Sequence, residues 1–324
     1  MATYYGTYGQ KVQYLASDPS DPQTGQVWYN STSAVLKVRS ATTSGAWASG
    51  GNLPAVRNGM VSAGTQTTAL VAGGYGTTAF LTSTFEYDGS TWTAGGNINT
   101  STTERGSCGT QTAALAWGSS GVSTATEEYD GSSWTTVPGT LNTGRAGSYG
   151  AGTQTAALAM GGNPSPTAVE EYDGTSWTNG GSLTNGGYFG AGAGTQTAGL
   201  FFGGTNAGPS GLFTTTSEYD GTSWTAGGSL ATGRWGLAGT GIQTAALAIG
   251  GFNGSNAITN VENYNGTAWS SETSLSTARY TMGNANSSPS SAACVYGGST
   301  PSVTNLTEEF TGAGAAVTRT VTVS

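Results

Sequence analysis

Adjacent acidic residues are the most obvious candidates for chemistry in this sequence. They occur as three pairs, Glu127-Glu128, Glu170-Glu171 and Glu308-Glu309. Two carboxylates flanking a glycosidic bond are what most glycoside hydrolases use. Neighbouring residues of a β-strand point to opposite faces, however, so the two members of a pair cannot meet at one substrate. Each pair also recurs at the same place in an internal repeat, which favours a structural or solvated role over catalysis.

The lack of histidine excludes several other kinds of catalytic site and metal site. The 324 residues contain no His, so a Ser-His-Asp or Cys-His nucleophile is impossible and zinc or copper lacks its usual nitrogen ligands. Lys11 and Lys37 do not follow glycine, which excludes a Gly-Lys-Ser/Thr phosphate loop. No loop has the alternating carboxylates of a calcium site. We therefore expect no enzyme activity, no catalytic residue, no metal and no cofactor.

The net charge restricts the possible binding partners, and the positions of the cysteines indicate whether they form a disulfide bond. A net charge of -8 argues against binding to nucleic acid or to an anionic membrane. No apolar stretch is long enough to span a membrane, and the opening residues lack the charged start and apolar run of a secretory signal. Cys108 and Cys294 fall in different repeats, so we expect both to be free, buried thiols.

An internal repeat organises most of the chain. A block that begins Ala-Gly-Thr-Gln-Thr-Ala-Ala-Leu, continues to a Gly-Gly doublet and ends Glu-Tyr-Asp-Gly-Ser-Ser-Trp recurs six times. The Asp-Gly steps predict two-residue hairpin turns of type I′, because glycine and aspartate readily take a positive φ. Gly-Thr-Gln-Thr predicts another tight turn, followed by a short buried strand. The sequence therefore predicts an all-β protein with four strands in each copy. Five copies close with a tryptophan, at spacings of 42 to 47 residues: Trp92, Trp134, Trp177, Trp224 and Trp269.

The details of the repeat resemble the kelch motif. The Gly-Gly doublet, the acidic-aromatic step, the tryptophan and an arginine at the start of the next copy carry this resemblance over roughly residues 43–312. It implies a six-bladed β-propeller. The other common propeller repeat of similar length carries a Gly-His step, which this chain cannot supply. The arginines are Arg57, Arg105, Arg145, Arg234 and Arg279, whereas the fourth copy has Gly187.

The sixth copy lacks its closing tryptophan, because Phe310 is followed by a glycine- and alanine-rich segment. The segment 44–47, which ends in Trp47, resembles 131–134 and precedes the first full copy. We expect it to supply the missing strand, since closure of a ring removes free sheet edges. The propeller would then span 41–312, with blades at approximately 53–95, 98–137, 141–180, 183–227, 230–272 and 275–312, the last completed by 41–50.

The segments on either side of the repeats indicate where the protein is located. Residues 1–40 form an N-terminal extension with a polar lead-in, a proline-bearing turn at 18–22 and a hairpin whose strands are 26–30 and 35–38. This hairpin motif resembles one in tail and appendage proteins of tailed bacteriophages, and the repeats resemble kelch-like proteins of marine phages. The resemblance implies a virion protein, such as a tail fibre, that is oligomeric on the particle. The hairpin would either dock on other virion proteins through Trp28 and Tyr29 or pack under the propeller. Residues 313–324 contain a C-terminal edge strand that could pair with the hairpin or with a neighbouring subunit.

Variation among the copies points to a binding surface. In a four-stranded blade the second turn and the link to the next blade lie on one face of the disc, and these segments differ most between copies. Aromatic rings beside amides and hydroxyls commonly hold sugars, so this face could bind a host-surface glycan or protein. The candidate residues are Tyr75, Phe80, Asn163, Asn206, Phe213, Phe252, Asn253, Tyr188, Arg234, Trp235, Arg279 and Tyr280.

Three functions remain open from the sequence. The first is a non-enzymatic virion component that is structural, decorative or receptor-binding. The second is a cellular kelch-type protein-interaction module, although no adaptor domain accompanies the repeats. The third is a propeller hydrolase or lyase that acts on polysaccharide.

Overall fold

The computed structural model describes residues 12–20, 26–41, 44–206, 211–313 and 316–321. These residues form β-strands and no helix, so the protein is all-β, as predicted. They divide into two compact units, one formed by Met1–Ala46 with Thr311–Ser324 and the other by Trp47–Phe310. The predicted lead-in over 1–11, the turn residues Asp21 and Pro22, and the last predicted strand residues, 322 and 323, lie outside the described residues.

The larger unit contains six four-stranded sheets, in which strands that follow one another along the chain pair antiparallel. We number the sheets one to six. Sheet one contains β5 (Val61–Thr65), β6 (Thr68–Ala72), β7 (Thr84–Tyr87) and β8 (Trp92–Gly95). Sheet two contains β9 (Gly106–Thr110), β10 (Ala113–Trp117), β11 (Thr126–Tyr129) and β12 (Trp134–Val137). Sheet three contains β13 (Tyr149–Thr153), β14 (Ala156–Met160), β15 (Val169–Tyr172) and β16 (Trp177–Asn179).

The other half of this unit repeats the pattern. Sheet four contains β17 (Ala191–Gly194), β18 (Gly199–Phe202), β19 (Thr216–Tyr219) and β20 (Trp224–Ala226). Sheet five contains β21 (Ala238–Ile242), β22 (Ala245–Ile249), β23 (Val261–Tyr264) and β24 (Trp269–Glu272). Sheet six contains β25 (Gly283–Asn284), β26 (Cys294–Tyr296), β29 (Thr307–Thr311) and β4 (Ala46–Ser49), and its second turn holds the short hairpin of β27 (Ser299–Thr300) and β28 (Ser302–Val303).

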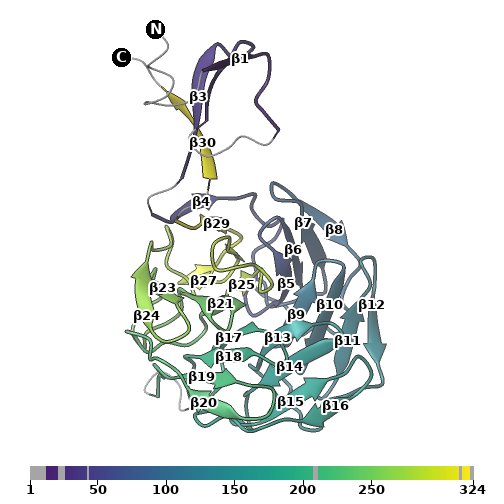
Figure 1. Ribbon diagram of the computed structural model, residues 1–324. Helices are drawn as coiled ribbons and strands as arrows, with labels where there is room; N and C mark the ends of the chain where they lie inside the picture. Colours follow the sequence, from purple (N-terminus) through teal and green to yellow (C-terminus); the bar gives the residue numbers. More distant parts are fainter. Residues whose placement is uncertain (1–11, 21–25, 42–43, 207–210, 314–315, 322–324) are drawn as a thin grey trace. The chain divides into compact units, whose positions relative to one another are not determined.

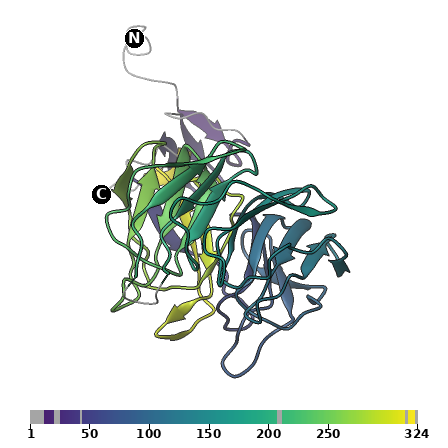
Figure 2. The same cartoon turned by 90° about the horizontal axis from the view of Figure 1, so that it is seen from below.

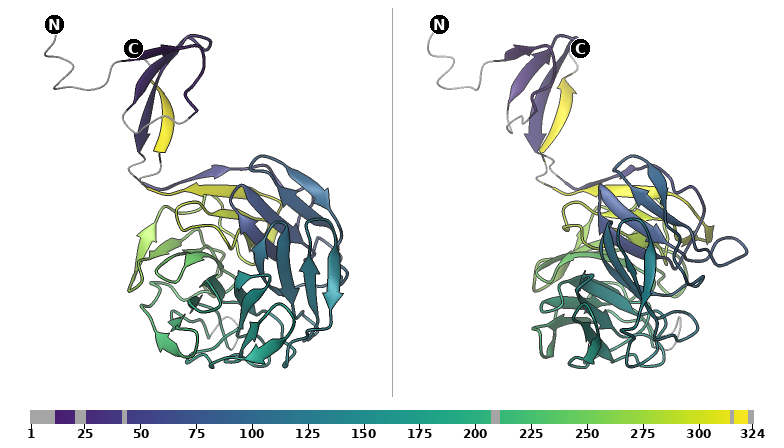
Figure 3. Two further views of the ribbon diagram at one scale, coloured as in Figure 1. Left: turned by 45° about the vertical axis from the view of Figure 1, so that its right-hand side comes forward. Right: turned by 90° about the vertical axis from the view of Figure 1, so that its right-hand side faces the viewer.

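Sheet six joins strands from the two ends of the repeat region. The order β25-β26-β29-β4 places the strand that contains Trp47 beside the strand that contains Phe310, as the left panel of Figure 3 shows. The two rings lie 5.1 Å apart between centroids, and Trp47 Nε1 donates a hydrogen bond of 2.8 Å to the carbonyl oxygen of Thr273 in the link from sheet five. The strand that the sixth copy lacks is thus supplied by residues 46–49.

The first strands of the six sheets lie next to one another around a common centre (Figure 1). In order, β5 contacts β9, β9 contacts β13, β13 contacts β17, β17 contacts β21, β21 contacts β25 and β25 contacts β5. Six backbone hydrogen bonds between the links follow the same cycle. Each N–H donates to the carbonyl of the preceding link over 2.7 to 3.1 Å, and the first link donates to the last. The six link residues are Gly59, Glu104, Gly147, Phe189, Gly236 and Thr281.

The hydrophobic core of this unit lies between neighbouring sheets. It consists of six clusters, each built from two successive sheets, and one of the six joins sheet six to sheet one. The small Ala-Ala-Leu strands are buried there from their second residue on, as predicted, and their first alanine is half-buried. Cys108 and Cys294 are free and buried, and burial raises the pKa of both thiols.

A tyrosine-carboxylate hydrogen bond crosses five of the joints between sheets. The tyrosine at the end of the third strand donates its hydroxyl to a glutamate of the preceding sheet, as Tyr172 does to Glu128 over 2.9 Å. At the joint between sheets five and six both partners change together, because Phe310 has no hydroxyl and Asn263 replaces the glutamate. The other donor and acceptor pairs are Tyr129 and Glu86, Tyr219 and Glu171, Tyr264 and Glu218, and Tyr87 and Glu309.

The glutamine of the Gly-Thr-Gln-Thr turn makes a second kind of bond across the joints. Gln154 Nε2 donates to the carbonyl oxygens of Ala114 and Tyr129 in the preceding sheet, over 3.0 and 2.7 Å. Gln66 makes the equivalent pair of bonds to Ala293 and Phe310 of sheet six. A residue conserved among the copies thus forms contacts between copies rather than a binding surface.

The Asp-Gly steps differ from the predicted type I′ turns. Tyr87 pairs with Trp92, and the Asp88 N–H donates to the carbonyl oxygen of Thr91 over 3.2 Å, so Gly89 and Ser90 form the tip of the turn. The carboxylate of Asp88 accepts hydrogen bonds from the backbone N–H groups of Ser90 and Thr91, while Gly89 alone takes a positive φ, 91°. The aspartate side chain closes the loop, so the aspartate backbone does not need a left-handed conformation.

The smaller unit is one four-stranded sheet in the order β1-β2-β3-β30. The predicted hairpin is present as β2 (Val27–Asn30) and β3 (Val35–Ala41), and β30 (Ala316–Val321) pairs antiparallel with β3, as Figure 3 shows. The additional strand β1 (Gln13–Leu15), which the sequence analysis missed, pairs parallel with β2.

Trp28 is not the exposed docking residue that the sequence suggested. It is fully buried in the smaller unit, where its indole N–H donates to Asp18 Oδ1 over 3.0 Å. Asn30 and Lys37 also bind this carboxylate, and these hydrogen bonds lower the pKa of Asp18 to about 2. The turn at residue 18 therefore folds over the hairpin and covers the tryptophan. Tyr29 is half-buried and stacks on Tyr14, which is 75% exposed.

Candidate functional site

The links and the second turns lie side by side on one face of the larger unit. Residues of the two segments form isolated antiparallel bridges, including Asn58 with Tyr75, Trp235 with Phe252 and Tyr280 with Ser299. The hairpin β27–β28, in yellow, projects from the sheets in Figure 2 and belongs to the second turn of sheet six. The segments that vary most between copies are thus brought together, as the repeat pattern predicts.

A cavity of about 500 Å³ opens among these segments, at the centre of the six sheets. Its walls carry residues of all six link regions and of the first strands beyond them, and this volume falls in the range typical of small-molecule sites. Five of the six residues of the link cycle described above line it, where Glu104, Phe189 and Thr281 join Gly59 and Gly147. These three side chains occupy positions with φ of 61°, 55° and 48°, where a non-glycine residue is strained.

The first loop of sheet six contributes Asn286 to the cavity wall. This loop lacks the Gly-Thr-Gln-Thr turn and instead reaches sheets one and two. Asn286 Nδ2 donates to the carbonyl oxygens of Ser62 and Ser107, and Ser287 binds Gly64 and Gly109. These bonds fix the position of Asn286 in the wall.

Aromatic rings line another part of the cavity. Phe189 packs on Trp235 with 5.5 Å between ring centroids, and Trp235 packs edge-on against Tyr280 at 5.3 Å. Tyr75 and Phe80 form a separate T-shaped pair from sheet one. All five of these rings line the cavity.

Four of the predicted binding residues therefore meet at the cavity: Tyr75, Phe80, Trp235 and Tyr280. Phe252 packs against Trp235 and Tyr280, and Tyr188 packs against Phe189, so these two rings support the wall from behind.

Four other predicted residues lie away from the cavity lining. Asn163 and Asn206 are exposed at second turns. The side chain of Asn253 caps its own turn, because its Oδ1 atom accepts from the N–H groups of Ser255 and Asn256. Phe213 lies against Gly187, the position that holds an arginine in most copies.

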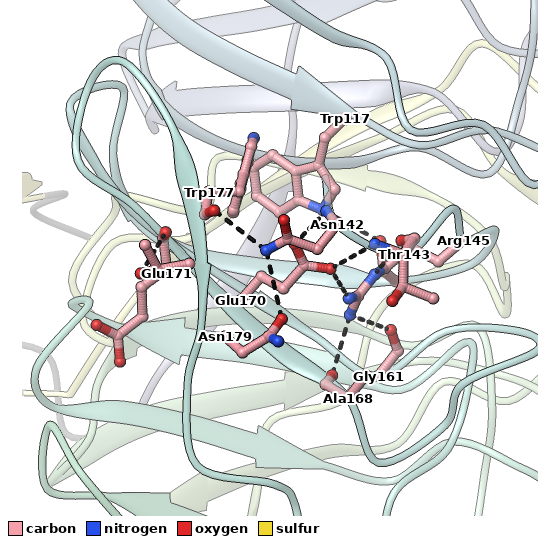
Figure 4. Close-up of polar contacts among 12 residues, drawn as sticks. Trp117, Asn142, Thr143, Arg145, Gly161, Ala168, Glu170, Glu171, Trp177 and Asn179 are labelled. Carbon is pink, nitrogen blue, oxygen red and sulfur yellow. Dashed lines mark hydrogen bonds and ion pairs between the residues drawn. The ribbon is translucent and has the colours of Figure 1, made fainter. Parts of the chain in front are cut away.

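Arg234 and Arg279 are not surface residues, contrary to the prediction. Both are fully buried and form ion pairs with Glu262 and Glu308. Figure 4 shows the equivalent group around Arg145, whose guanidinium pairs with Glu170 and donates to the carbonyl oxygens of Gly161 and Ala168. A buried arginine is stable only with such partners.

The carboxylates of these buried ion pairs also accept hydrogen bonds from backbone N–H groups. Glu170 also accepts the backbone N–H groups of Asn142 and Thr143 in the link (Figure 4). The first glutamate of each adjacent pair therefore ties a link to its own sheet, while the second accepts a tyrosine hydroxyl from the next sheet. The two members point to opposite faces, as expected.

Sheets one and four have no arginine–glutamate pair at these two positions. In sheet one, Phe85 stands in the glutamate position, and the Arg57 guanidinium lies 4.9 Å from its ring centroid. Burial lowers the pKa of Arg57 to about 10. In sheet four the combination is Gly187 with Ser217. The arginines therefore stabilise the sheets and do not form a ring of reactive groups.

Arg105 differs from the other arginines in register. The cycle of link hydrogen bonds aligns Glu104 with Gly147, so Thr102 aligns with Arg145 and Arg105 stands three residues later. Its guanidinium still reaches Glu127 at 2.6 Å, but from a position that lines the cavity. The sequence alignment of Arg105 with the other four arginines was wrong at this point.

Glu104 is the one acidic residue among the residues that line the cavity. It is half-buried, and burial raises its pKa. Its carboxylate makes no hydrogen bond or ion pair with another described residue, because the neighbouring Arg105 is held by Glu127. Burial and this carboxylate together raise the pKa of Tyr149, which also lines the cavity. The cavity thus carries an unbalanced negative charge.

The sequence analysis missed Glu104, Phe189, Tyr149 and Asn286 as site residues. None belongs to a second turn, where variation between copies is easiest to see. One signal was present, because Glu104 and Phe189 replace a glycine that Gly147 and Gly236 retain at the equivalent position. A residue that departs from a repeated glycine was therefore the informative feature.

Comparison with known proteins identified no matching family model. No curated protein matches the sequence either. Among the residues that the structure describes, no helix is long and apolar enough to cross a membrane, and no group of three or more acidic or cysteine side chains is placed to hold a metal ion.

Proposed function

We propose that the larger unit is a closed six-bladed propeller and that it acts as a non-enzymatic binding protein. The cyclic contacts of the six first strands, the six hydrogen bonds between links and the composite sheet six support this closure. Closure gives the links a fixed geometry around one axis. A ring of rigid links suits binding better than mobile loops do, since less conformational entropy is lost when a ligand is held.

The proposed binding site is the central cavity on the face of links and second turns. The observation that carries this proposal is the gathering of six aromatic side chains beside amide and hydroxyl side chains in one cavity. Aromatic rings stack on the apolar faces of sugars, while open donors and acceptors bind hydroxyl groups. We infer that the cavity holds a sugar residue of a larger glycan, such as one displayed on a host surface.

The distribution of carboxylates favours binding over hydrolysis. A glycoside hydrolase needs two carboxyl groups about 5 to 10 Å apart across the scissile bond. The cavity lining contains only Glu104, and the glutamates of the adjacent pairs are held by arginine, backbone N–H and tyrosine partners. A second acid to complete such a pair is therefore missing from the described lining.

We further propose that the protein is a component of a phage particle, a tail fibre or other appendage, and that the smaller unit docks it there. The resemblance of the N-terminal hairpin to phage appendage proteins motivates this proposal. The Tyr14–Tyr29 stack, whose outer ring is 75% exposed, provides an apolar surface suited to a partner protein. Immunogold labelling of intact particles should locate the protein on the tail or its appendages, and labelling confined to unassembled material would contradict the virion assignment.

Binding to glycans tests the proposed site directly. Purified full-length protein should bind a subset of sugars on a glycan array, and Trp235→Ala should lose that binding because it removes a central ring of the wall. Tyr75→Ala, in the second turn of sheet one, should weaken it as well. Ile242→Ala is the matched control, since Ile242 is an exposed apolar residue of a first turn. Equal binding by all four proteins would place the ligand elsewhere.

A further inference from the structure

Glu104 occupies a position where the fold itself prefers glycine. Gly59, Gly147 and Gly236 hold the equivalent place in three other links and share its positive φ. A glutamate with a φ of 61° is strained relative to glycine. Its side chain adds no contact that would offset the strain, because the carboxylate has no hydrogen-bond or ion-pair partner within the described chain. Strain at such a position is typical of functional sites.

The charge around this carboxylate is not balanced by the protein. Arg105 is the one basic residue of the lining, and its guanidinium pairs with Glu127 and approaches the carbonyl oxygen of Ala116. The phenol of Tyr149 is the remaining ionisable group whose pKa this carboxylate affects. A half-buried carboxylate without a counter-charge attracts a cation more strongly than an exposed one does, since solvent screens it less.

The aromatic wall suits the same kind of ligand. Phe189, Trp235 and Tyr280 form a continuous set of rings in the cavity, and an ammonium group is attracted to the faces of such rings. A cation between a carboxylate and these rings would gain from both. The lining carries, in addition, amide and hydroxyl side chains that pair with hydroxyl groups of a ligand. A hydroxylated ammonium compound meets all of these requirements.

From this juxtaposition of Glu104, the aromatic wall and the amide and hydroxyl side chains of the lining we propose that the cavity selects a sugar that carries a free, protonated amino group. This inference rests on the proposed function and names its ligand class. The ammonium group would bind the Glu104 carboxylate, and the ring hydroxyls would pair with amide and hydroxyl side chains of the lining. An N-acetylated sugar would lack the charge and leave Glu104 unpaired.

The test compares two oligosaccharides that differ only in acetylation. Full-length protein is titrated calorimetrically in 150 mM salt with the tetramer of glucosamine and with the tetramer of N-acetylglucosamine. We expect the glucosamine tetramer to bind at least about tenfold more tightly, because a charged hydrogen bond is worth about 1.5–3 kcal/mol. Glu104→Gln, which keeps the shape of the side chain, should bring the two affinities within about twofold. Ile242→Ala should keep the full preference.

Two further arms make each outcome decisive. Glu104→Gly should fold at least as well as the parent protein, since glycine relieves the positive φ, and it should also lose the preference. Tetramethylammonium chloride tests the cation without hydroxyls, and binding as tight as that of the amino sugar would overturn the assignment to a sugar. A glucosamine preference that survives both Glu104 variants would reflect the overall charge of the protein and would overturn the inference.

The failure of this inference can be distinguished from the failure of the proposed function. If both tetramers bind equally and Trp235→Ala abolishes their binding, the cavity binds glycans but does not select an ammonium group. If neither tetramer binds but another glycan does so in a manner that depends on Trp235, the proposed function stands and the ligand class is wrong. If no glycan binds at all, both are rejected.

Discussion

The Glu171 carboxylate accepts the hydroxyl of Tyr219 from the next sheet. Tyr219→Phe removes that donor, so the Glu171 carboxylate between the two sheets loses its hydrogen bond. The variant should therefore lose about 1–3 kcal/mol of unfolding free energy. Urea denaturation would measure the loss. The chain contains its own control, since Phe310 and Asn263 already form a joint without this bond. The double change Asn263→Glu with Phe310→Tyr should therefore be better tolerated than Asn263→Glu alone.

Glycine at residue 174 is required by the backbone of its turn. Its φ of 92° lies outside the range that an L-residue adopts comfortably. Gly174→Ala should lower the unfolding free energy by about 1–3 kcal/mol because of this strain. Gly121→Ala is the matched control, since a Cβ atom there would meet only the Ser119 hydroxyl at 3.8 Å and the φ is not positive. Equal thermal midpoints for the two variants would contradict this account.

At the scale of elements, the glutamine of the first turn acts as a clamp between sheets. Gln154→Ala removes two hydrogen bonds to carbonyl oxygens of sheet two and should cost about 1–3 kcal/mol. Thr155→Ala, at the exposed neighbour in the same turn, should change the unfolding free energy by less than about 0.5 kcal/mol. Hydrogen exchange should show the loss concentrated at the joint between sheets two and three. A uniform change over all six sheets would contradict the assignment to one joint.

The elements that recur in the copies could be predicted from the sequence, whereas the departures from the repeat could not. Residues that recur, such as the Ala-Ala-Leu strands and the tight Gln-Thr turns, identified the strands because every copy meets the same packing. The shift of Arg105 by three residues was hidden, since a side chain can reach Glu127 from either position. The loop at Asn286 was also hidden, because its partners lie in sheets one and two, far away in the sequence. The burial of Trp28 depends on Asp18, whose role only the folded chain reveals.

At the scale of the whole molecule, alkaline pH should destabilise the protein in two steps. Burial raises the pKa of Cys108 and Cys294 above their ordinary value of 9.0. Burial and the neighbouring carboxylate raise the pKa of Tyr219 and Tyr264 to about 12. The folded state thus holds these protons more tightly than the unfolded state does. Stability is fully present below the unfolded pKa and is lost as pH rises above it.

The expected loss begins above about pH 9 with the thiols and steepens between about pH 10 and 12 with the tyrosines. Thermal midpoints measured from pH 7 to 12 would show it. A variant with both cysteines replaced by alanine should lack the first step and retain the second. A decline that starts below pH 8 would require another titrating group.

Trp47 connects the two ends of the propeller-like unit. Trp47→Ala removes the packing on Phe310 and the hydrogen bond to Thr273, and should lower the unfolding free energy by about 2–4 kcal/mol. Trp28→Phe, in the smaller unit, should leave the unfolding of the larger unit unchanged. Denaturation followed by hydrogen exchange of sheet six would separate the two effects.

Because β4 ends at Ser49 and β29 begins only at Thr307, their pairing also orders events in time. A ribosome releases β4 first, and this strand must wait without its neighbour while five sheets are synthesised. The same holds for β3, whose partner β30 follows β29 in the chain. Neither unit can therefore be complete before these two strands are made, and a chain truncated ahead of β29 would carry two unpaired strand edges open to other chains.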